Sequence, residues 1–157
     1  MAKSDCKIII QEFSQVTAQH YRLLLDADPS RKIVDSYLPR ANKFELSTGG
    51  QLLGLIVLLP TRPETVEIVN IAVDEKFQNH GYGEKLLRFA INWAQKQNYH
   101  TLEIGTGSTS FGQLYLYQKC GFRIVGVDTD FFVDNYDEPI IENKLVLKDM
   151  LRLKLRI

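Results

Sequence analysis

The chain has 157 residues, 45% of them hydrophobic, which is enough to build the core of about one domain. Lysine and arginine together number 19, as do aspartate and glutamate, so no global field draws the protein to nucleic acid or to an anionic membrane. Cys6 and Cys120 show no metal-ligand spacing and suit a reducing compartment as free thiols. The longest apolar stretch, Leu52 to Leu59, is too short to cross a bilayer. We expect one cytoplasmic domain over residues 1–157, without a metal.

The first half of the chain predicts a strand, two helices and three further strands. Ile8 to Phe13 has the pattern of a strand, and the apolar spacing from Val16 to Asp26 indicates a helix. Asp28 and Pro29 suit the N-cap and the first position of a second helix, which runs to about Leu38. The glycine pair at 49 and 50 indicates a hairpin, and prolines at 60 and 63 interrupt the chain after it. An antiparallel meander is expected from the three strands: Lys43 to Ser47, Gln51 to Leu59 and Thr65 to Val73.

A crossover helix follows the meander. The segment from Tyr82 to Gln97 keeps its apolar residues on one face, as expected of an amphipathic helix. His100 to Gly105 is a short strand after it. A helix of this length joins parallel strands, so we expect this strand to pair in parallel with Thr65 to Val73.

The C-terminal third predicts one more helix and two strands. Ser110 and Gln113 form a capping box for a helix that ends at Gly121. Arg123 to Val133 is expected to be a strand, and a loop follows it. The apolar residues of the tail alternate from Leu151 to Ile157, which indicates a terminal strand with one buried face. Such a strand could pair with or pack on a second subunit, so a homodimer is one possible assembly.

The loop between Val73 and Tyr82 carries two glycines, Gly81 and Gly83. Glycine lets the backbone come close to a ligand, and N–H groups at a helix start can point at an anion. The helix dipole adds about half a positive charge at that end. This pattern is typical of a phosphate cradle, although glycine also opens many helices for packing reasons alone.

Two motifs, in this order along the chain, are more specific. The first is Gln78, Gly81 and Gly83, which has the form Gln or Arg, two variable residues, Gly, one variable residue, then Gly or Ala. The second is Leu116 to Phe122, which is similar to Leu-Tyr-Glu-Lys-x-Gly-Phe. Together they resemble the two signatures of the GNAT superfamily of acetyl-coenzyme A dependent N-acetyltransferases. The resemblance implies an α/β (α+β layered) fold: a central, mixed, mostly antiparallel twisted sheet of about seven strands with a splayed parallel pair, flanked by about four helices.

The resemblance implies acetyl-coenzyme A as the co-substrate. Pantetheine would lie alongside backbone groups of Ile71, Ala72 and Val73. Ser110 occupies the place where many family members carry an asparagine that reaches the cofactor. His80 and Tyr82 would frame the loop without chemistry of their own. The pyrophosphate would be held by the amides of the loop and helix start: Gln78, Asn79, His80, Gly81, Tyr82, Gly83 and Glu84.

Amide formation needs a base, because a primary amine with a pKa of roughly 10 is almost wholly protonated at neutral pH. By the two-residue period, Glu67 shares a strand face with Ile71, and it is the only carboxylate on that face. The sequence Glu67-Ile68-Val69 resembles the histone-acetylating branch of the superfamily, in which a glutamate of this strand is the base. A solvated residue at a strand end is the alternative interpretation of Glu67.

The departing coenzyme A thiolate needs a proton, and a tyrosine hydroxyl can share one. Tyr117 stands at the family's position for that acid, and the alternative is a packed tyrosine with its hydroxyl satisfied. Tyr115 faces elsewhere on the helix and is expected to pack, and Cys120 is expected to be a core thiol. The resemblance assigns the oxyanion to a backbone N–H, that of Ile71.

Six acidic residues and no lysine or arginine lie between Asp128 and Glu142, interspersed with aromatic residues. The family's acceptor pocket is commonly bordered by this loop, so we expect acceptor contacts from Phe131, Tyr136 and Asp137. Asn70 points the other way from Glu67 on its strand; it is a further candidate for acceptor contact, and a local hydrogen-bonding residue is the alternative. A small cationic amine is the expected acceptor, and an ordinary solvated loop is the alternative. Proteins with a similar loop carry the label indole-acetic acid acetyltransferase, but indole acetate is an anion without a free amine.

Two other classes of protein use similar features. A sensor or interaction module of the same fold would bind acyl-coenzyme A through Gln78, Gly81 and Gly83 and would need neither Glu67 nor Tyr117. A generic nucleotide-binding α/β protein would use the same glycine loop. The missing full Gly-x-Gly-x-x-Gly fingerprint argues against that second class.

Overall fold

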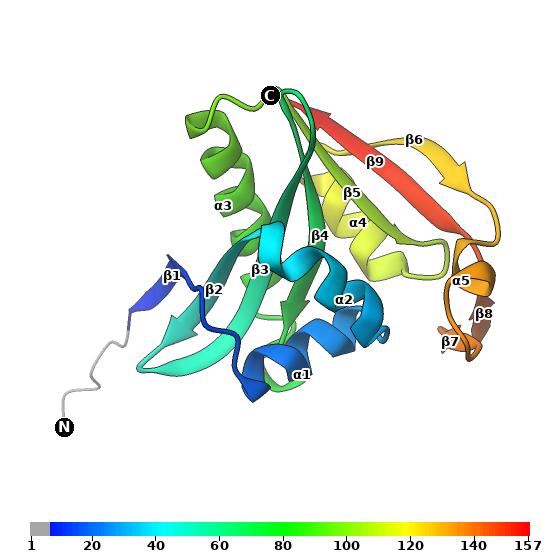
Figure 1. Cartoon of the computed structure of the whole chain (residues 1–157), viewed down its shortest axis with the longest axis horizontal. Helices are drawn as coiled ribbons and strands as arrows, with labels where there is room; N and C mark the ends of the chain where they lie inside the picture. Colours follow the sequence, from blue (N-terminus) through cyan, green and yellow to red (C-terminus); the bar gives the residue numbers. More distant parts are fainter. Residues whose placement is uncertain (1–6) are drawn as a thin grey trace. The chain divides into compact units, whose positions relative to one another are not determined.

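The computed structural model describes residues 7–157, so Cys6 lies outside the described residues. Seven strands form one mixed sheet, which confirms the predicted sheet (Figure 1). The strands, in their hydrogen-bonded order, are β1 (Ile8–Glu12), β2 (Asn42–Thr48), β3 (Gln51–Arg62), β4 (Thr65–Val73), β5 (Thr101–Gly107), β9 (Met150–Arg156) and β6 (Arg123–Asp128). A separate hairpin pairs β7 (Ile140–Glu142) with β8 (Leu145–Leu147).

Five α-helices and two short 3₁₀ segments complete the described part of the chain. No helix within residues 7–157 combines the length and the apolar character needed to cross a membrane. The elements are α1 (Ala18–Ala27), α2 (Arg31–Tyr37), η1 (Leu38–Arg40), η2 (Glu75–Phe77), α3 (Tyr82–Lys96), α4 (Phe111–Lys119) and α5 (Phe131–Asp134).

The chain divides into two compact units, each made of two segments. The first unit holds the described residues up to Leu59 together with Val69–Ala90, and the second holds Pro60–Ile68 and Ile91–Ile157. The elements β3, β4 and α3 each begin in one unit and end in the other. A single domain over residues 1–157 stays a prediction.

In the first unit, β2 and β3 form the predicted antiparallel hairpin. Its turn uses Gly49 and Gly50, at φ 54° and 80°, which are left-handed values that glycine adopts freely. The strand β3 runs through Pro60 to Arg62, so the predicted break at Pro60 is wrong. The β2 ladder ends at Leu58, so proline's missing N–H costs no hydrogen bond to β2.

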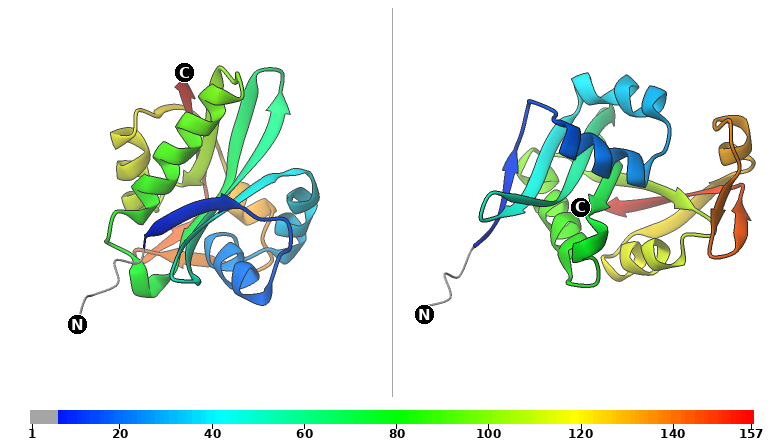
Figure 2. Two further views of the ribbon diagram at one scale, coloured as in Figure 1. Left: turned by 90° about the vertical axis from the view of Figure 1, so that its left-hand side faces the viewer. Right: turned by 90° about the horizontal axis from the view of Figure 1, so that it is seen from below.

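The helices α1 and α2 lie on one side of β2 and β3, and the start of α3 lies on the other (Figure 2). Their core is an apolar cluster that includes Leu23 and Leu24 of α1, Val34 of α2, and Leu55 and Val57 of β3. The predicted cap of α2 is wrong by two residues. Ser30 caps the helix, while Asp28 ends α1 and accepts a hydrogen bond from the Ser30 N–H. Both side chains are good caps, so local sequence could not choose between them.

The α3 side of the first unit is packed closely at Gly54. A Cβ at this position would lie 2.7 Å from the Ala72 carbonyl oxygen and 3.3 Å from Leu86 of α3. Leu86 and Leu87 are fully buried, and the rings of Phe44 and Phe89 meet edge to face at 4.9 Å. Glycine at 54 therefore lets β4 and α3 approach β3 together.

In the second unit, β4 and β5 run parallel, as predicted, with Thr65 to Ile68 opposite Thr101 to Ile104. The ladder ends there, although both strands continue. The terminal strand β9 pairs with β5 on one edge and β6 on the other. Both edges of β9 are occupied, so a second subunit cannot pair along this strand, and a homodimer formed by packing on it stays a prediction.

Two more predictions fail in the second unit. The strand β6 ends at Asp128, because Asp130 takes a left-handed conformation, φ 61°, and opens the short helix α5. The predicted loop from Asp134 to Asn143 contains β7, which forms a hairpin with β8 through a turn with positive φ at Asn143 and Lys144. Tight hairpin turns with two positive φ values usually show Asn-Gly, so Asn-Lys gave no clear signal. Gly121 ends α4 as predicted, at φ 103°.

Candidate active site

The loop before α3 bends through two left-handed residues, Asn79 at φ 64° and Gly81 at φ 80°. A Cβ on Gly81 would meet no atom within 4 Å, so a side chain would fit there. Glycine is favoured at this position because of its left-handed backbone conformation. The Lys85 N–H donates to the Gly81 carbonyl at 3.1 Å in a helical hydrogen bond. The N–H groups of Tyr82 and Gly83 come before this bond, at the helix start, where N–H groups have no carbonyl of the helix to donate to. This is the geometry of an anion cradle at a helix N-terminus.

Side chains of the loop hold its shape. The His80 Nδ1 lies 3.0 Å from the Phe77 carbonyl oxygen and 2.8 Å from that of Gln78, so this nitrogen carries the proton and donates. The Gln78 side chain donates from Nε2 to the Val73 carbonyl at 3.1 Å. The rings of His80 and Tyr82 stack at 5.9 Å. These contacts agree with the predicted framing role of His80 and Tyr82.

Asp74, which the sequence motifs leave out, organises the turn between β4 and the cradle. It is 7% exposed and caps η2, accepting from the Lys76 N–H at 3.0 Å through Oδ1. Its Oδ2 accepts from Arg22 of α1 at 2.5 Å, and its own N–H donates to the Leu53 carbonyl at 2.8 Å. An aspartate directly after a strand is a weak capping signal, and nothing local points to Arg22.

Asn70 is buried on the opposite face of β4 from Ile71, which alternates with it. Its Nδ2 donates to the Leu24 carbonyl at 3.1 Å and to the Tyr37 hydroxyl at 3.0 Å, so it ties α1 and α2 to the strand. Burial raises the pKa of Tyr37, and the hydrogen bond from Asn70 opposes that shift. The Asn70 Oδ1 is buried with no hydrogen-bond partner among the described residues. Contact of Asn70 with an acceptor stays a prediction.

Glu67 is half-buried in the part of β4 that belongs to the second unit. Burial raises the pKa of its carboxyl, and the positive charges of Arg152 and then Arg62 oppose the shift. Glu103 stands beside it in the parallel ladder, and Arg62 forms an ion pair with Glu103. A carboxylate with a raised pKa is better matched to removing a proton from an ammonium group than an ordinary glutamate is. The interpretation of Glu67 as a solvated strand-end residue is therefore weakened.

Tyr117 is buried on α4, at 4% exposure, with its ring 6.3 Å from that of Phe122. Burial raises the pKa of its hydroxyl. No donor or acceptor within residues 7–157 pairs with that hydroxyl, so the alternative of a satisfied, packed tyrosine lacks its hydrogen bond. Tyr115 is 69% exposed, which overturns its expected packing role, whereas Cys120 is buried as a free thiol, as expected.

Ser110 is the N-cap of α4, but the predicted capping box with Gln113 does not form. Ser110 is buried, at 7% exposure, and its hydroxyl donates to Glu142 Oε2 of β7 at 2.8 Å. Its N–H donates to the Gly107 carbonyl at 3.1 Å. A contact between Ser110 and a cofactor stays a prediction, and the hydroxyl oxygen can still accept a hydrogen bond.

The acidic segment from Asp128 to Glu142 is less uniformly negative than the sequence suggests. Arg152 of β9 donates to Asp128 at 2.7 Å and 2.6 Å, and Glu142 accepts from Ser110. The rings of Phe131, Phe132 and Tyr136 form an aromatic cluster, with centroids 5.2 to 6.5 Å apart. The remaining acids of the segment are exposed: Asp130, Asp134, Asp137 and Glu138.

Residues 11–122, which are more than half of the chain, match the model of the Acetyltransferase (GNAT) family. The chain belongs to the GNAT acetyltransferase family. The resemblance drawn from Gln78 to Gly83 and from Leu116 to Phe122 is thereby confirmed, and the protein is an acetyltransferase.

Relatives of this GNAT chain cover nearly all of it. The uncharacterized N-acetyltransferase YvbK of Bacillus subtilis (strain 168) is 51% identical over 149 residues, 95% of this chain and 96% of that protein. The structure of IAA acetyltransferase from Bacillus cereus ATCC 14579 is 44% identical, with a TM-score of 0.91 over 96% of this chain and 100% of that one. A GNAT acetyltransferase from Elizabethkingia anophelis, with acetyl-CoA bound, is 46% identical, with a TM-score of 0.92 over 96% and 98%.

The residues predicted to form the site belong to both compact units. The cradle and the end of β4, from Asn70 to Glu84, lie in the first unit. Glu67, Tyr117, Ser110 and the aromatic loop lie in the second. Within residues 7–157 there is no group of three His, Cys, Asp or Glu side chains that could hold a metal ion.

Proposed function

We propose that the protein transfers an acetyl group from acetyl-coenzyme A to the primary amine of a small cationic molecule, by direct attack in a ternary complex. One observation carries the proposal. The strand β4 bears Glu67, a carboxylate whose pKa is raised by burial, and leads at its other end into the anion cradle. Family membership and the acetyl-CoA bound to the Elizabethkingia relative support the choice of donor.

The donor would be held mainly through backbone. The pyrophosphate would sit against the amides from Gln78 to Glu84, where the helix dipole favours negative charge. Pantetheine would lie along Ile71, Ala72 and Val73, with Ser110 as a further contact. The Gln78 side chain donates to the Val73 carbonyl, so a hydrogen bond joins the end of the strand to the start of the cradle.

In the proposed reaction, Glu67 takes the proton from the acceptor ammonium, directly or through water. The freed amine nitrogen attacks the thioester carbon and forms the new C–N bond, while the Ile71 N–H stabilises the oxyanion. The C–S bond then breaks and Tyr117 gives its proton to the departing thiolate. The amide nitrogen loses its second proton, which restores Tyr117, and Glu67 releases its own proton to water. No covalent enzyme intermediate is required.

The acceptor is proposed to be cationic because the loop combines exposed acids with an aromatic cluster. Asp134, Asp137 and Glu138 would attract an ammonium group, and the rings of Phe131 and Tyr136 would add cation–π contact. The label of the Bacillus cereus relative, IAA acetyltransferase, does not extend to this chain in our proposal. Indole acetate is an anion without a free amine, and the exposed acids would repel it.

Thiol release from acetyl-coenzyme A over a panel of amines and indole acetate tests the proposal. We expect turnover with diamines and other small ammonium compounds and none with indole acetate. Turnover with neutral or anionic acceptors and not with cationic amines would overturn the proposal of a cationic acceptor. Tight acetyl-coenzyme A binding without turnover of any amine would point instead to a sensor. A cytoplasmic location, in a reducing compartment, is proposed from the free thiol of Cys120.

A further inference from the structure

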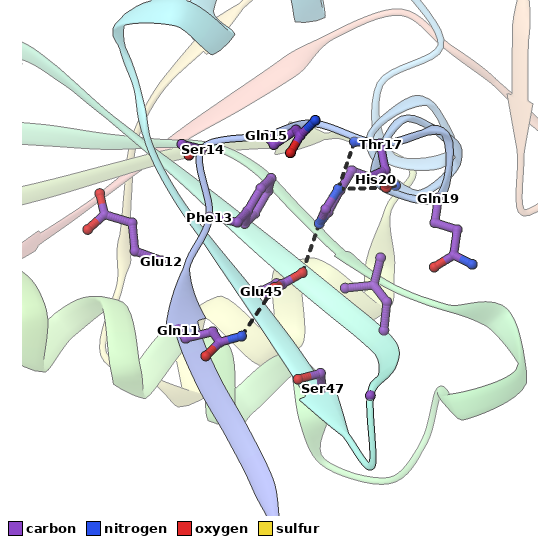
Figure 3. A pocket seen from close by; sticks show the side chains of 12 residues that line it. Gln11, Glu12, Phe13, Ser14, Gln15, Thr17, Gln19, His20, Glu45 and Ser47 are labelled. Atoms are coloured by element: carbon purple, nitrogen blue, oxygen red, sulfur yellow. Dashed lines mark hydrogen bonds and ion pairs between the residues drawn. The ribbon is translucent and has the colours of Figure 1, made fainter.

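A pocket of about 510 Å³ lies in the first unit, between β1, the start of α1 and the β2–β3 hairpin (Figure 3). It is separate in sequence from every residue assigned to acetyl transfer. Its lining is mostly polar, and no lysine or arginine contributes to it within the described part of the chain. Its polar side chains include Gln11, Glu12, Gln15, Gln19, Glu45 and Ser47.

His20 lines the pocket and is buried, at 6% exposure. Its Nδ1 accepts the backbone N–H of Thr17 at 3.0 Å, in a capping box at the start of α1. A ring nitrogen that accepts a hydrogen bond carries no proton, so the proton lies on Nε2, which donates to Glu45 Oε2 at 2.8 Å. The imidazole is therefore neutral in this arrangement. Phe13 stacks on the ring at 4.0 Å and fixes its plane.

With a neutral imidazole, Glu45 has no cationic partner within residues 7–157. Its Oε2 is occupied by His20, while Oε1 has only the Gln11 amide at 3.5 Å, a long and weak hydrogen bond. The Glu45 side chain is 20% exposed, so it is partly withdrawn from solvent yet open to the pocket. A partly buried carboxylate with one free oxygen is a strong acceptor for a charged donor.

We propose that this pocket binds an organic ammonium ion, with Glu45 Oε1 as its counter-ion. The amides and hydroxyls around it would take the remaining N–H donors, and the Phe13–His20 stack would face the carbon chain. The neutral His20 is what makes the site selective for a cation, because a protonated imidazole would already compensate Glu45. This binding site is independent of acetyl transfer and needs no acetyl-coenzyme A.

Titration of the full chain with 1,4-diaminobutane, without acetyl-coenzyme A, tests the site, with 1,4-butanediol as the neutral isostere. The chain has three histidines, so comparison with His80→Gln and His100→Gln assigns the His20 ring signals in an NMR spectrum. We expect the diamine to shift the His20 signals and the diol to leave them in place. Glu45→Gln keeps an acceptor for His20 Nε2 but removes the charge, and should weaken diamine binding about tenfold or more.

Glu64→Gln is the matched control, because Glu64 faces His100 at 3.8 Å in an open pair, with side chains 70% and 63% exposed. It should leave the affinity at the His20 site unchanged, and thermal melts should show both variants folded. Equal responses to diamine and diol would overturn the proposal. Unmoved His20 signals would do the same, as would equal affinity in Glu45→Gln and the wild type. None of these outcomes depends on catalysis, so the proposed acetyl transfer stands or fails separately.

Discussion

Arg22 of α1 donates to the buried carboxylate of Asp74 at 2.5 Å, at the turn where β4 leads into the cradle. The same carboxylate caps η2 through the Lys76 N–H, and the Asp74 carbonyl accepts from the Phe77 N–H at 2.8 Å. Asp74 thus holds the turn ahead of Gln78 through its side chain and its backbone carbonyl, and its carboxylate ties the turn to a helix of the same unit. Asp74 is a positioning residue for the cradle.

Replacing Asp74 with alanine removes this cap and should raise the Michaelis constant for acetyl-coenzyme A more than it lowers kcat. Loss of a buried, charge-assisted acceptor should also reduce the free energy of unfolding by about 1–3 kcal/mol. Steady-state kinetics and chemical denaturation measure the two effects. Asp35→Ala is the control, since its ion pair with Arg31 is exposed, and it should cost less than about 1 kcal/mol. An unchanged Michaelis constant would rule out the positioning role.

The pH profile of kcat/KM should fall on the acid side as Glu67 becomes protonated. Burial raises its pKa above the ordinary value of 4.5, so this limb should lie at higher pH than an ordinary glutamate would give. Glu67→Gln should lose the limb and lower kcat by about 10²-fold. Retention of the same limb in this variant would assign the base elsewhere.

Stability separates a catalytic Glu67 from a structural one. The folded protein holds the Glu67 proton more tightly than the unfolded chain does, so ionising Glu67 opposes folding once the pH exceeds its unfolded pKa. At neutral pH, Glu67→Gln should therefore not lower the melting temperature. A marked loss of stability, measured by thermal unfolding, would indicate that the carboxylate mainly holds the fold.

Tyr117→Phe should lower kcat by about 10²-fold without destabilising the protein, because its hydroxyl has no partner among the described residues. Tyr37→Phe is the matched control. It deletes a buried hydroxyl that accepts from Asn70, so it should cost about 1 kcal/mol of stability. Kinetics and denaturation on both variants test the contrast, and a Tyr117→Phe enzyme with wild-type kcat would remove Tyr117 from the proton path.

Gly81→Ala should weaken acetyl-coenzyme A binding and cost about 1 kcal/mol of stability, because φ 80° is strained for alanine even though space is available. Gly112→Ala should stabilise the protein by up to about 1 kcal/mol, since Gly112 lies within α4 with open space around it. Calorimetric titration with coenzyme A and thermal unfolding distinguish the two glycines. Equal affinity of the two variants for coenzyme A would contradict the proposal that the left-handed conformation at Gly81 is needed for binding.

Neutralising the exposed acids of the acceptor loop together, in a variant with Asp134→Asn, Asp137→Asn and Glu138→Gln, should raise the Michaelis constant for a cationic amine several-fold. The variant lacks the electrostatic attraction of these acids for the amine. Added salt screens the same attraction in the wild type, so it should raise the wild-type Michaelis constant toward that of the variant. Glu64→Gln, an exposed acid of the same unit, should have no effect. An unchanged constant for the amine would mean that the loop is an ordinary solvated one.

Local sequence predicted the elements around the cradle well. The strand Thr65–Val73 has the predicted bounds, and α3 ends one residue before the predicted Gln97. Both have a clear hydrophobic period, which the sheet and the core reinforce. Predictions failed where tertiary contacts overrode the local pattern. The Asp130 N–H donates to Asp149 Oδ1 and stops β6, and Ser110 turns its hydroxyl to Glu142 and not to the backbone of its own helix.

The sequence by itself determined the family, the cradle and the identity of Glu67 and Tyr117 as candidates, because glycine spacing and strand periodicity act over a few residues. Only the tertiary structure decided which distant side chains share a proton or a charge. Arg22 meets Asp74 across 52 positions, and His20 meets Glu45 across 25, and no local pattern encodes either pair. Packing sets these contacts, because a buried polar group must find its partner wherever the fold brings one within reach.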